Sequence, residues 1–550
     1  MSHRPNIVPP NMPLVVQFGF AGSRELLKKG EHPGVDQSDF YARVEEHLCG
    51  VLRELPRALG LSEKHFLCGV SQIAIGADTI FTRACMRLGF LQRIFLPEHR
   101  DAYFAAADKD GERDFADAEV RVAEELLRDA HIIEERVVSN SAKRSERFED
   151  VNLDLVRVSD VLVALRRADA PGKIGGTMDL IERAGVRHRP LLEITVSVRD
   201  GHPFFAEKWH PNKPPDADKD APLLGVPGIP PVLAACHAPG GDGFAPALKE
   251  FAGARAQRNQ WFFIWAAFVI VGTHFFATFC SGWGLAFHGK AGDIPPRLLV
   301  AELLLLFIGF CFHGWLHRSR TGEQWAIARL VSEIARSVTS MSKVPGYLGH
   351  LFVLPVPELL RPLMRTLNVF HLDATRGMDP SGWSDRRDAY IHERLTREPG
   401  GQIPYYRKHY RRACCRLCAA NLAFYIGSML AFVAALTELL DKSDYLRARC
   451  PCAVIGWLDQ YAETLGHWPA FLAIILPVLA VAALSLAASF DLEARKHTYR
   501  EMVAALKQHK GHIEHAKSEH EFVHLVLLIE TRLVGENVNW FSRRVFTGVT

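Results

Sequence analysis

A short glycine-rich turn near the start of the chain carries residue types that can bind phosphate. Gly19, Gly22, Ser23 and Arg24 lie in the stretch Phe18 to Arg24, between an apolar run and a helical pattern. Glycines let a backbone approach a ligand closely, and the start of a helix offers free N–H groups. The guanidinium of Arg24 can form paired hydrogen bonds with a phosphate. Taken alone, the turn is equally typical of an ordinary connection between a strand and a helix.

Two later loops have similar chemistry, each at a predicted junction between a strand and a helix. They consist of Gly76, Ala77 and Asp78 before the helical stretch 79–88, and of Gly175, Gly176 and Thr177 before the stretch 178–184. Loops at the carboxyl ends of the strands of an open parallel sheet meet at one crevice. The three loops are therefore predicted to form a single site for phosphate and ribose.

A parallel sheet is needed to bring these loops together, and residues 14 to about 196 have the pattern of one. Short apolar runs alternate with helical patterns, which is typical of a sheet wrapped by helices. The predicted strands are 14–18, 65–70, 93–96, 160–165 and 190–194. Prolines and glycines then accumulate between Gly201 and Gly243, which indicates a connector. We expect a Rossmann-like α/β domain that ends before this connector.

Four later apolar runs are long enough to cross a membrane, which takes about 20 residues of helix. They are 261–280, 298–316, 418–440 and 468–490. Arginines lie before the first and third runs and after the second and fourth, so these ends are expected in the cytoplasm. The start of the chain lacks the pattern of a cleavable signal. We therefore expect a multi-pass membrane protein whose N- and C-termini are both cytoplasmic.

Polar side chains interrupt the apolar runs at His274, Glu302, His313 and Asn421. A charged side chain at mid-membrane costs about 2.5–3.5 kcal/mol, so such residues usually face protein or a water-filled lumen. His274 and Glu302 are therefore candidate pore residues. Glu302 lies only one turn inside its run, and a side chain that reaches the interface explains it equally well.

An amphipathic, charged helix is predicted after each pair of runs, at Trp325 to Ser337 and at Leu492 to Trp540. A duplicated two-span unit is the economical interpretation. The predicted segments are 1–197 (ligand-binding domain), 198–250 (Pro/Gly-rich linker), 251–340 (first two-span unit with its following helix), 341–412 (cytoplasmic connector) and 413–550 (second two-span unit with a long C-terminal cytoplasmic helix).

Other classes of function receive little support. The formal net charge is only +3 and basic residues are spread along the chain, so a nucleic-acid polymer is not an expected partner. His520 to His524 matches the zincin pattern of two histidines one turn apart, but no third ligand follows. The stretch also fits the polar face of a helix whose apolar positions are Phe522, Val526 and Ile529. We expect no metal, no cofactor and no catalytic residue.

Residues 14–196 resemble a SLOG domain, the Rossmann-like relative of the LOG nucleotide phosphoribohydrolases. The resemblance rests on five pieces in order, namely Gly19 to Arg24, Ile75 to Asp78, Leu96-Pro97 with Tyr103 and Asp114-Phe115 downstream, Val158 to Ala164, and Gly175 to Thr177. It implies a site that binds a nucleotide or an NAD-derived small-molecule signal. It also implies that Asp160, in the fourth piece, belongs to that site.

The sequence departs from the enzymatic LOG pattern at one position. LOG enzymes carry Pro-Gly-Gly-x-Gly-Thr with a glutamate three residues after the threonine. The corresponding residue here is Leu180, and the nearby acids Asp179 and Glu182 are out of register. We therefore expect binding without turnover, and a membrane-tethered nucleotide phosphoribohydrolase of LOG type is the alternative.

The C-terminal half is similar to the SLATT group, the transmembrane effectors associated with SMODS nucleotidyltransferases and SLOG sensors in bacterial defence operons. The similarity rests on the paired runs, on Arg329, Glu333 and Arg336, on Gln402 to Tyr406, and on Glu530 to Trp540. It implies a homo-oligomeric effector of the bacterial cytoplasmic (inner) membrane that permeabilises or disrupts the bilayer in abortive infection. A constitutive transporter, suggested only by Pro477 within the fourth run, is the second alternative.

Overall fold

The structure, a computed structural model, describes residues 15–27, 34–59, 61, 65–106, 115–170, 175–210, 243–288, 295–357, 360–442 and 466–546. The chain divides into two compact units. The first consists of residues 1–247 and 344–378, and the second of residues 248–343 and 379–550. Part of the segment predicted as a connector, 344–378, therefore belongs to the first unit.

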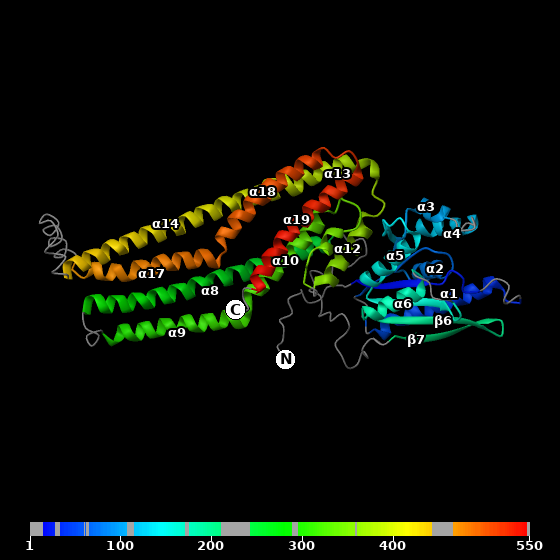
Figure 1. Cartoon of the computed structure of the whole chain (residues 1–550), viewed down its shortest axis with the longest axis horizontal. Helices are drawn as coiled ribbons and strands as arrows, with labels where there is room; N and C mark the ends of the chain where they lie inside the picture. Colours follow the sequence, from blue (N-terminus) through cyan, green and yellow to red (C-terminus); the bar gives the residue numbers. More distant parts are fainter. Residues whose placement is uncertain are drawn as a thin grey trace. The chain divides into compact units, whose positions relative to one another are not determined.

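A seven-stranded sheet forms the centre of the first unit (Figure 1). Its strands are β1 (Val15–Gly22), β2 (Phe66–Ser71), β3 (Leu91–Leu96), β4 (Ile132–Val137), β5 (Val161–Arg167), β6 (Leu191–Arg199) and β7 (His202–Trp209). The strand order is β4-β3-β2-β1-β5-β6-β7. All neighbours pair in parallel except β6 and β7, which are antiparallel. The predicted mostly parallel α/β sheet is confirmed, and its strand order reverses at β1, between β2 and β5.

Two strands of this sheet were not predicted. In β4, Ile132 and Ile133 are buried but the charged residues Glu134, Glu135 and Arg136 follow, so the strand has no long apolar run. The other, β7, lies inside the range predicted as linker and leaves most of its side chains accessible. An edge strand needs only backbone hydrogen bonds to one neighbour, so its sequence need not be apolar.

Helices cover both faces of the sheet. They are α1 (Gln37–Ala58), α2 (Ala77–Arg87), α3 (Arg100–Ala105), α4 (Asp117–Leu127), α5 (Arg144–Val158) and α6 (Thr177–Val186). Phe18 and Phe20 of β1 are buried with apolar residues of α1 and α2, while Leu162 and Ala164 of β5 are buried with residues of α5 and α6. Burial on both faces explains the continuous apolar runs from which the central strands were predicted.

The segment 344–378 packs at the amino ends of the strands. It contains α11 (Gly349–Val353) and α12 (Arg361–Thr375). The Thr366 hydroxyl oxygen accepts a hydrogen bond of 3.0 Å from the backbone N–H of Val15, the first residue of β1. The ring of Phe370 meets that of Phe66, the first residue of β2, edge to face at 5.1 Å. This segment is therefore an integral part of the first unit.

The second unit is helical in its described residues. Its elements are α8 (Phe244–His288, whose first residues belong to the first unit), α9 (Pro296–Ser319), α10 (Thr321–Ser340), η3 (Pro380–Gly382), α13 (Trp383–Tyr390), the π-helix η4 (Ile391–Thr396), α14 (Gln402–Lys442), α17 (Trp468–Ser489), α18 (Leu492–Glu514) and α19 (Glu519–Phe546). Among the described residues, four stretches are long and apolar enough to cross a membrane, namely Phe244–Phe287, Pro296–Ser319, Gln402–Leu439 and Trp468–Ser489. Each predicted run corresponds to one of these helices, α8, α9, α14 and α17 (Figure 1).

The helix predicted from Leu492 to Trp540 is in fact two helices. It is interrupted between His515 and Ser518, and a new helix start forms there. The Ser518 hydroxyl oxygen accepts from the backbone N–H of Glu521 at 3.2 Å, and the Glu521 carboxylate accepts from the backbone N–H of Lys517 at 2.8 Å. Serine followed three residues later by glutamate is a helix-start signal. The interruption was therefore readable in the sequence.

The structural interpretation of the zincin-like stretch is confirmed. Phe522, Val526 and Ile529 are fully buried on α19, while His520 and His524 are exposed.

Candidate ligand site and buried polar network

The first two predicted loops interlock at the carboxyl ends of β1 and β5. The backbone N–H of Ser23 donates to the carbonyl of Leu165 at 2.9 Å, and the N–H of Ala77 donates to the carbonyl of Ser23 at 3.2 Å. The N–H of Gly22 donates to Oδ1 of Asp78 at 3.2 Å. These bonds join the end of β1 to its neighbour β5 and to the start of α2. The junction lies where the strand order reverses, which is where open α/β sheets bind ligands.

The glycines of these loops permit close packing. A Cβ atom on Gly22 would lie 2.1 Å from Cβ of Ala77. Gly76 has φ +92°, and a Cβ atom there would lie 1.9 Å from the carbonyl oxygen of Arg24. Gly19 is inside β1 rather than in the turn, and a Cβ atom on it would lie 2.1 Å from Oγ of Ser159. All three glycines are thus required by the fold, whether or not a ligand binds.

Arg24 lies over aromatic rings. Its guanidinium carbon is 5.6 Å from the ring centroid of Phe115 and 5.8 Å from that of Phe148. Phe115 in turn meets the buried ring of Tyr103 at 5.0 Å. Phe115 and Tyr103 belong to the core, whereas Phe148 is only partly buried. The site therefore combines a cation with one accessible aromatic ring, and such groups can recognise a phosphate and a nucleobase.

Asp78 is a buried carboxyl group beside this cation, with 4% of its surface exposed. Burial raises the pKa of Asp78 to about 7, although the charge of Arg24 and the backbone N–H groups of Gly22 and Ala74 act in the opposite direction. The group is thus poised between its neutral and charged forms near neutral pH. An anion bound at Arg24 would favour the neutral form further, because it would repel the carboxylate.

The third loop reaches the same place through Phe148. Gly175 has φ +75°, and a Cβ atom on it would lie 2.6 Å from Cβ of Phe148. Gly176 precedes the first turn of α6, which begins at Thr177. Phe148 of α5 thus lies between the third loop and Arg24. Sequence reasoning missed Phe148, because nothing in the pattern of α5 distinguishes it from a core residue.

Asp160 does not join these loops. It precedes β5 and lies at the amino ends of the strands, where its Oδ2 accepts from the backbone N–H of Gln17 at 3.0 Å. Its other oxygen forms an ion pair with Arg365 of α12. Asp160 therefore holds the segment 344–378 on the sheet, at the edge opposite the candidate site.

The residues near the LOG glutamate position have other partners. Leu180 is fully buried in the core of the first unit. The Asp179 carboxylate accepts from Nδ2 of Asn152 at 2.9 Å and from Nε of Arg183 at 2.9 Å. Glu182 points to solvent. The residue in register with the LOG glutamate is thus an apolar core residue.

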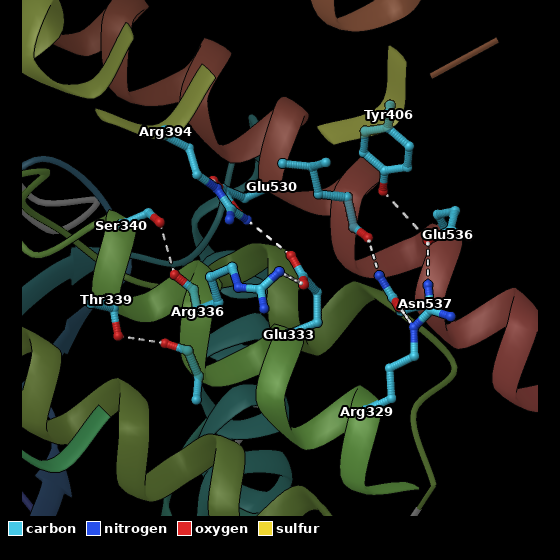
Figure 2. A network of polar contacts seen from close by, with 12 residues as sticks. Arg329, Glu333, Arg336, Thr339, Ser340, Arg394, Tyr406, Glu530, Glu536 and Asn537 are labelled. Carbon is cyan, nitrogen blue, oxygen red and sulfur yellow. Dashed lines mark hydrogen bonds and ion pairs between the residues drawn. The ribbon is translucent and has the colours of Figure 1, made fainter. Parts of the chain in front are cut away.

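A second polar cluster is buried in the second unit, around Arg394 of the π-helix η4 (Figure 2). The Arg394 guanidinium donates to both carboxylate oxygens of Glu530, at 2.9 and 2.8 Å, and to Glu333 at 3.2 Å. The Tyr390 hydroxyl donates to Glu530 at 2.8 Å. Arg336 completes the group with a 2.9 Å bond to Glu333. Four elements, α10, α13, η4 and α19, are thereby joined by charge-assisted hydrogen bonds.

Arg329 extends this network toward the end of α19. Its Nε donates to Oδ1 of Asn537 at 2.9 Å, and its guanidinium lies 3.9 Å from the Glu536 carboxylate and 4.5 Å from the Trp540 ring. The Tyr406 hydroxyl of α14 donates to the same carboxylate at 3.4 Å. Figure 2 shows Arg329 and Glu333 on α10 facing the α19 residues. Many of the residues that carry the resemblance in this half therefore belong to these two groups of contacts, namely Arg329, Glu333, Arg336, Tyr406, Glu530, Glu536, Asn537 and Trp540.

Burial and pairing oppose each other within the network. Burial would raise the pKa of Glu333, but Arg336 and Arg394 outweigh it and hold that pKa below its usual value. For Glu536 burial dominates, and its pKa is raised despite nearby Arg329. Arg394 stays charged, because Glu530 and Glu333 offset the cost of burying it. Arg394 and Tyr390 were not predicted, because the charged stretch that contains them reads as solvent-exposed.

The two candidate pore residues lie in different surroundings. Glu302 lines a hollow between α8 and α9, together with Cys280, Ser281, Leu285, Leu298 and Leu299. His274 is exposed, and α9 approaches it at Gly309, where a Cβ atom would lie 2.7 Å from Oγ1 of Thr273 and 3.5 Å from Nε2 of His274. Both residues therefore border the line along which α8 and α9 meet.

The comparisons found no match to this chain among protein-family models, curated proteins or solved structures.

Proposed function

We propose that this chain is a membrane effector. Its N-terminal SLOG-like domain binds a nucleotide or NAD-derived signal, and its four spans respond by permeabilising the bacterial inner membrane as an oligomer, in defence by abortive infection. The observation that carries the proposal is the meeting of three loops, Arg24 and aromatic rings at the reversal of the strand order, in a chain with four membrane-length helices. A membrane anchor needs only one helix, so we infer that the four spans themselves carry out the response to the ligand.

The chemistry of the candidate site favours a ligand with both a phosphate and an aromatic base. Arg24 offers a cation for the phosphate, and Phe148, which is only partly buried, offers a ring for the base. Asp78 adds a group whose charge depends on what binds beside it. An LOG-type hydrolase would need a carboxylate in register with the third loop, and Leu180 stands there.

The chain connects the ligand-binding unit to the unit that contains the spans at both ends of the segment 344–378. The segment 344–378 is held in the first unit by Asp160 and Arg365, and the residues before and after it belong to the second unit. In the second unit, the Arg394 network joins α10, which follows the first pair of spans, to α19, near the C-terminal end of the chain. A ligand that favours one arrangement of these parts would bias a two-state membrane assembly.

The duplicated two-span unit is part of the proposal. In both halves a non-glycine residue with positive φ stands between the second long helix and the helix that follows it, Arg320 at 48° and Asp491 at 52°. A helix with charged residues, α10 or α18, begins directly after each. Such residues are uncommon, so the same device at equivalent places supports a common origin. The line between α8 and α9, with His274 and Glu302, is the proposed lumen.

The test is dye leakage from liposomes that contain the full-length protein. The probes are AMP, ADP-ribose, NAD⁺ and cyclic di-AMP, each added separately. We expect leakage with at least one probe, its loss in Arg24→Ala, and its retention in Arg128→Ala, which removes an arginine with a 74% exposed side chain elsewhere on the first unit. Binding measured by calorimetry without leakage would refute the pore. Release of free base from a probe would favour the hydrolase instead.

A further inference from the structure

The first turns of α14 and of α18 are predicted to lie on the cytoplasmic side of the membrane, next to the third and fourth spans. They carry an excess of positive charge. Five exposed cations lie on α14 within three turns, namely Arg407, Lys408, Arg411, Arg412 and Arg416. The helix contains no acid from Gln402 until Glu438. The first three turns of α18, which packs along α14, add Arg495, Lys496 and Arg500. Only Asp491, Glu493 and Glu501 oppose these eight cations at the start of α18.

Arg495 is the cation placed closest to the end of the fourth span, α17, which finishes at Ser489. Its Nε–H is buried and has no acceptor among the residues that the structure describes. Burial and the charge of Arg329 both lower the pKa of Arg495, although Tyr499 and Asp491 oppose them. The guanidinium is thus held in a place where an additional anion would stabilise it.

The position of this cluster identifies the kind of anion. Clusters of lysine and arginine directly beside a membrane span attract anionic headgroups, with about 1 kcal/mol for each cation near the surface. Cytosolic anions reach the same charges, but they gain nothing from the apolar helices that begin within a few residues.

We propose that Arg495, together with the exposed cations of α14, the helix that packs along α18, binds the phosphate group of an anionic phospholipid. The partly buried guanidinium of Arg495 is the specific donor, and the row from Arg407 to Arg416 provides attraction that is not specific in geometry. The site lies in the second unit and does not depend on the ligand of the first unit or on permeabilisation.

The test measures which lipids the full-length protein retains. Protein in detergent is mixed with equal amounts of phosphatidylglycerol and phosphatidylcholine, and native mass spectrometry counts each lipid bound. The wild type should prefer phosphatidylglycerol, and Arg495→Gln should lower this preference about fivefold, the value of one cation. Lys507→Gln, an exposed change about 18 Å farther along α18, should leave it unchanged.

Two results would overturn the proposal. One is an equal preference in Arg495→Gln and Lys507→Gln, provided that both keep the far-ultraviolet circular dichroism of the wild type. The other is displacement of phosphatidylglycerol by millimolar inorganic phosphate, which would identify a site for free phosphate. Should Arg495→Gln fail to fold, the exposed pair Arg411→Gln and Arg412→Gln tests the same attraction, and an unchanged lipid preference there would refute it.

Discussion

Removing the Glu530 carboxylate should strongly destabilise the second unit. Glu530 is fully buried, and Arg394 is only 4% exposed. Replacing Glu530 by leucine removes two charge-assisted hydrogen bonds to Arg394, at 2.9 and 2.8 Å, and the acceptor of the Tyr390 hydroxyl at 2.8 Å. One ion pair to Glu333, at 3.2 Å, remains. Because a buried cation then lacks its main partner, we expect a loss of about 3–5 kcal/mol.

The measurement is unfolding of the purified protein by SDS titration in mixed micelles, followed by circular dichroism. Glu393→Gln is the matched control, because it breaks an exposed ion pair in the same unit. Glu393 pairs with Lys343, and their side chains are 58% and 55% exposed, respectively. Its effect should be a small fraction of that of Glu530→Leu, since exposed pairs contribute little. The double variant Arg394→Met with Glu530→Leu should be more stable than Glu530→Leu alone, because it leaves no unpaired charge.

Either of two outcomes would refute this reasoning. If Glu530→Leu unfolds at the same SDS fraction as Glu393→Gln, the network does not hold α10 and α19 together. If the double variant loses as much stability as the single variants Arg394→Met and Glu530→Leu added together, Arg394 and Glu530 do not act as a pair.

Three further predictions concern the first unit and the topology. The pKa of Asp78 is about 7 in the folded state and lower in the unfolded state. The free energy of unfolding should therefore fall by up to about 4 kcal/mol as the pH rises from about 4 to 7, and level off above 7. Thermal unfolding measured across this pH range should lack that decrease in Asp78→Asn. Gly76→Ala should lower the melting temperature far more than Gly89→Ala, because both have positive φ but only the Gly76 Cβ would meet a neighbour, the Arg24 carbonyl; equal losses would leave backbone conformation as the whole cause. Protease sites inserted after Gly382 and at the C-terminus should both resist protease added to intact spheroplasts, and cleavage at one alone would mean an odd number of spans.

Some features of this protein follow from the sequence alone because they depend on local composition. The length and apolarity of a run decide whether a helix can cross a membrane, so all four candidate spans were predicted. Strands buried on both faces have continuous apolar runs, so β1, β2, β3, β5 and β6 were predicted as well. The loops after β1 and β2 were expected to meet, since parallel strands bring their carboxyl ends to one edge.

Other features depend on contacts between residues far apart in the chain, and only the tertiary structure decided them. Asp160 lies between a helix and a strand, and this local pattern is the same whether its side chain faces a ligand or Arg365. Only the structure places it at the amino ends of the strands, paired with Arg365. Phe148 and Arg394 look like an ordinary core residue and an ordinary surface residue until Arg24 and Glu530 are placed beside them. A buried charge becomes recognisable only through its partner, because the same arginine is soluble when exposed and costly when buried alone.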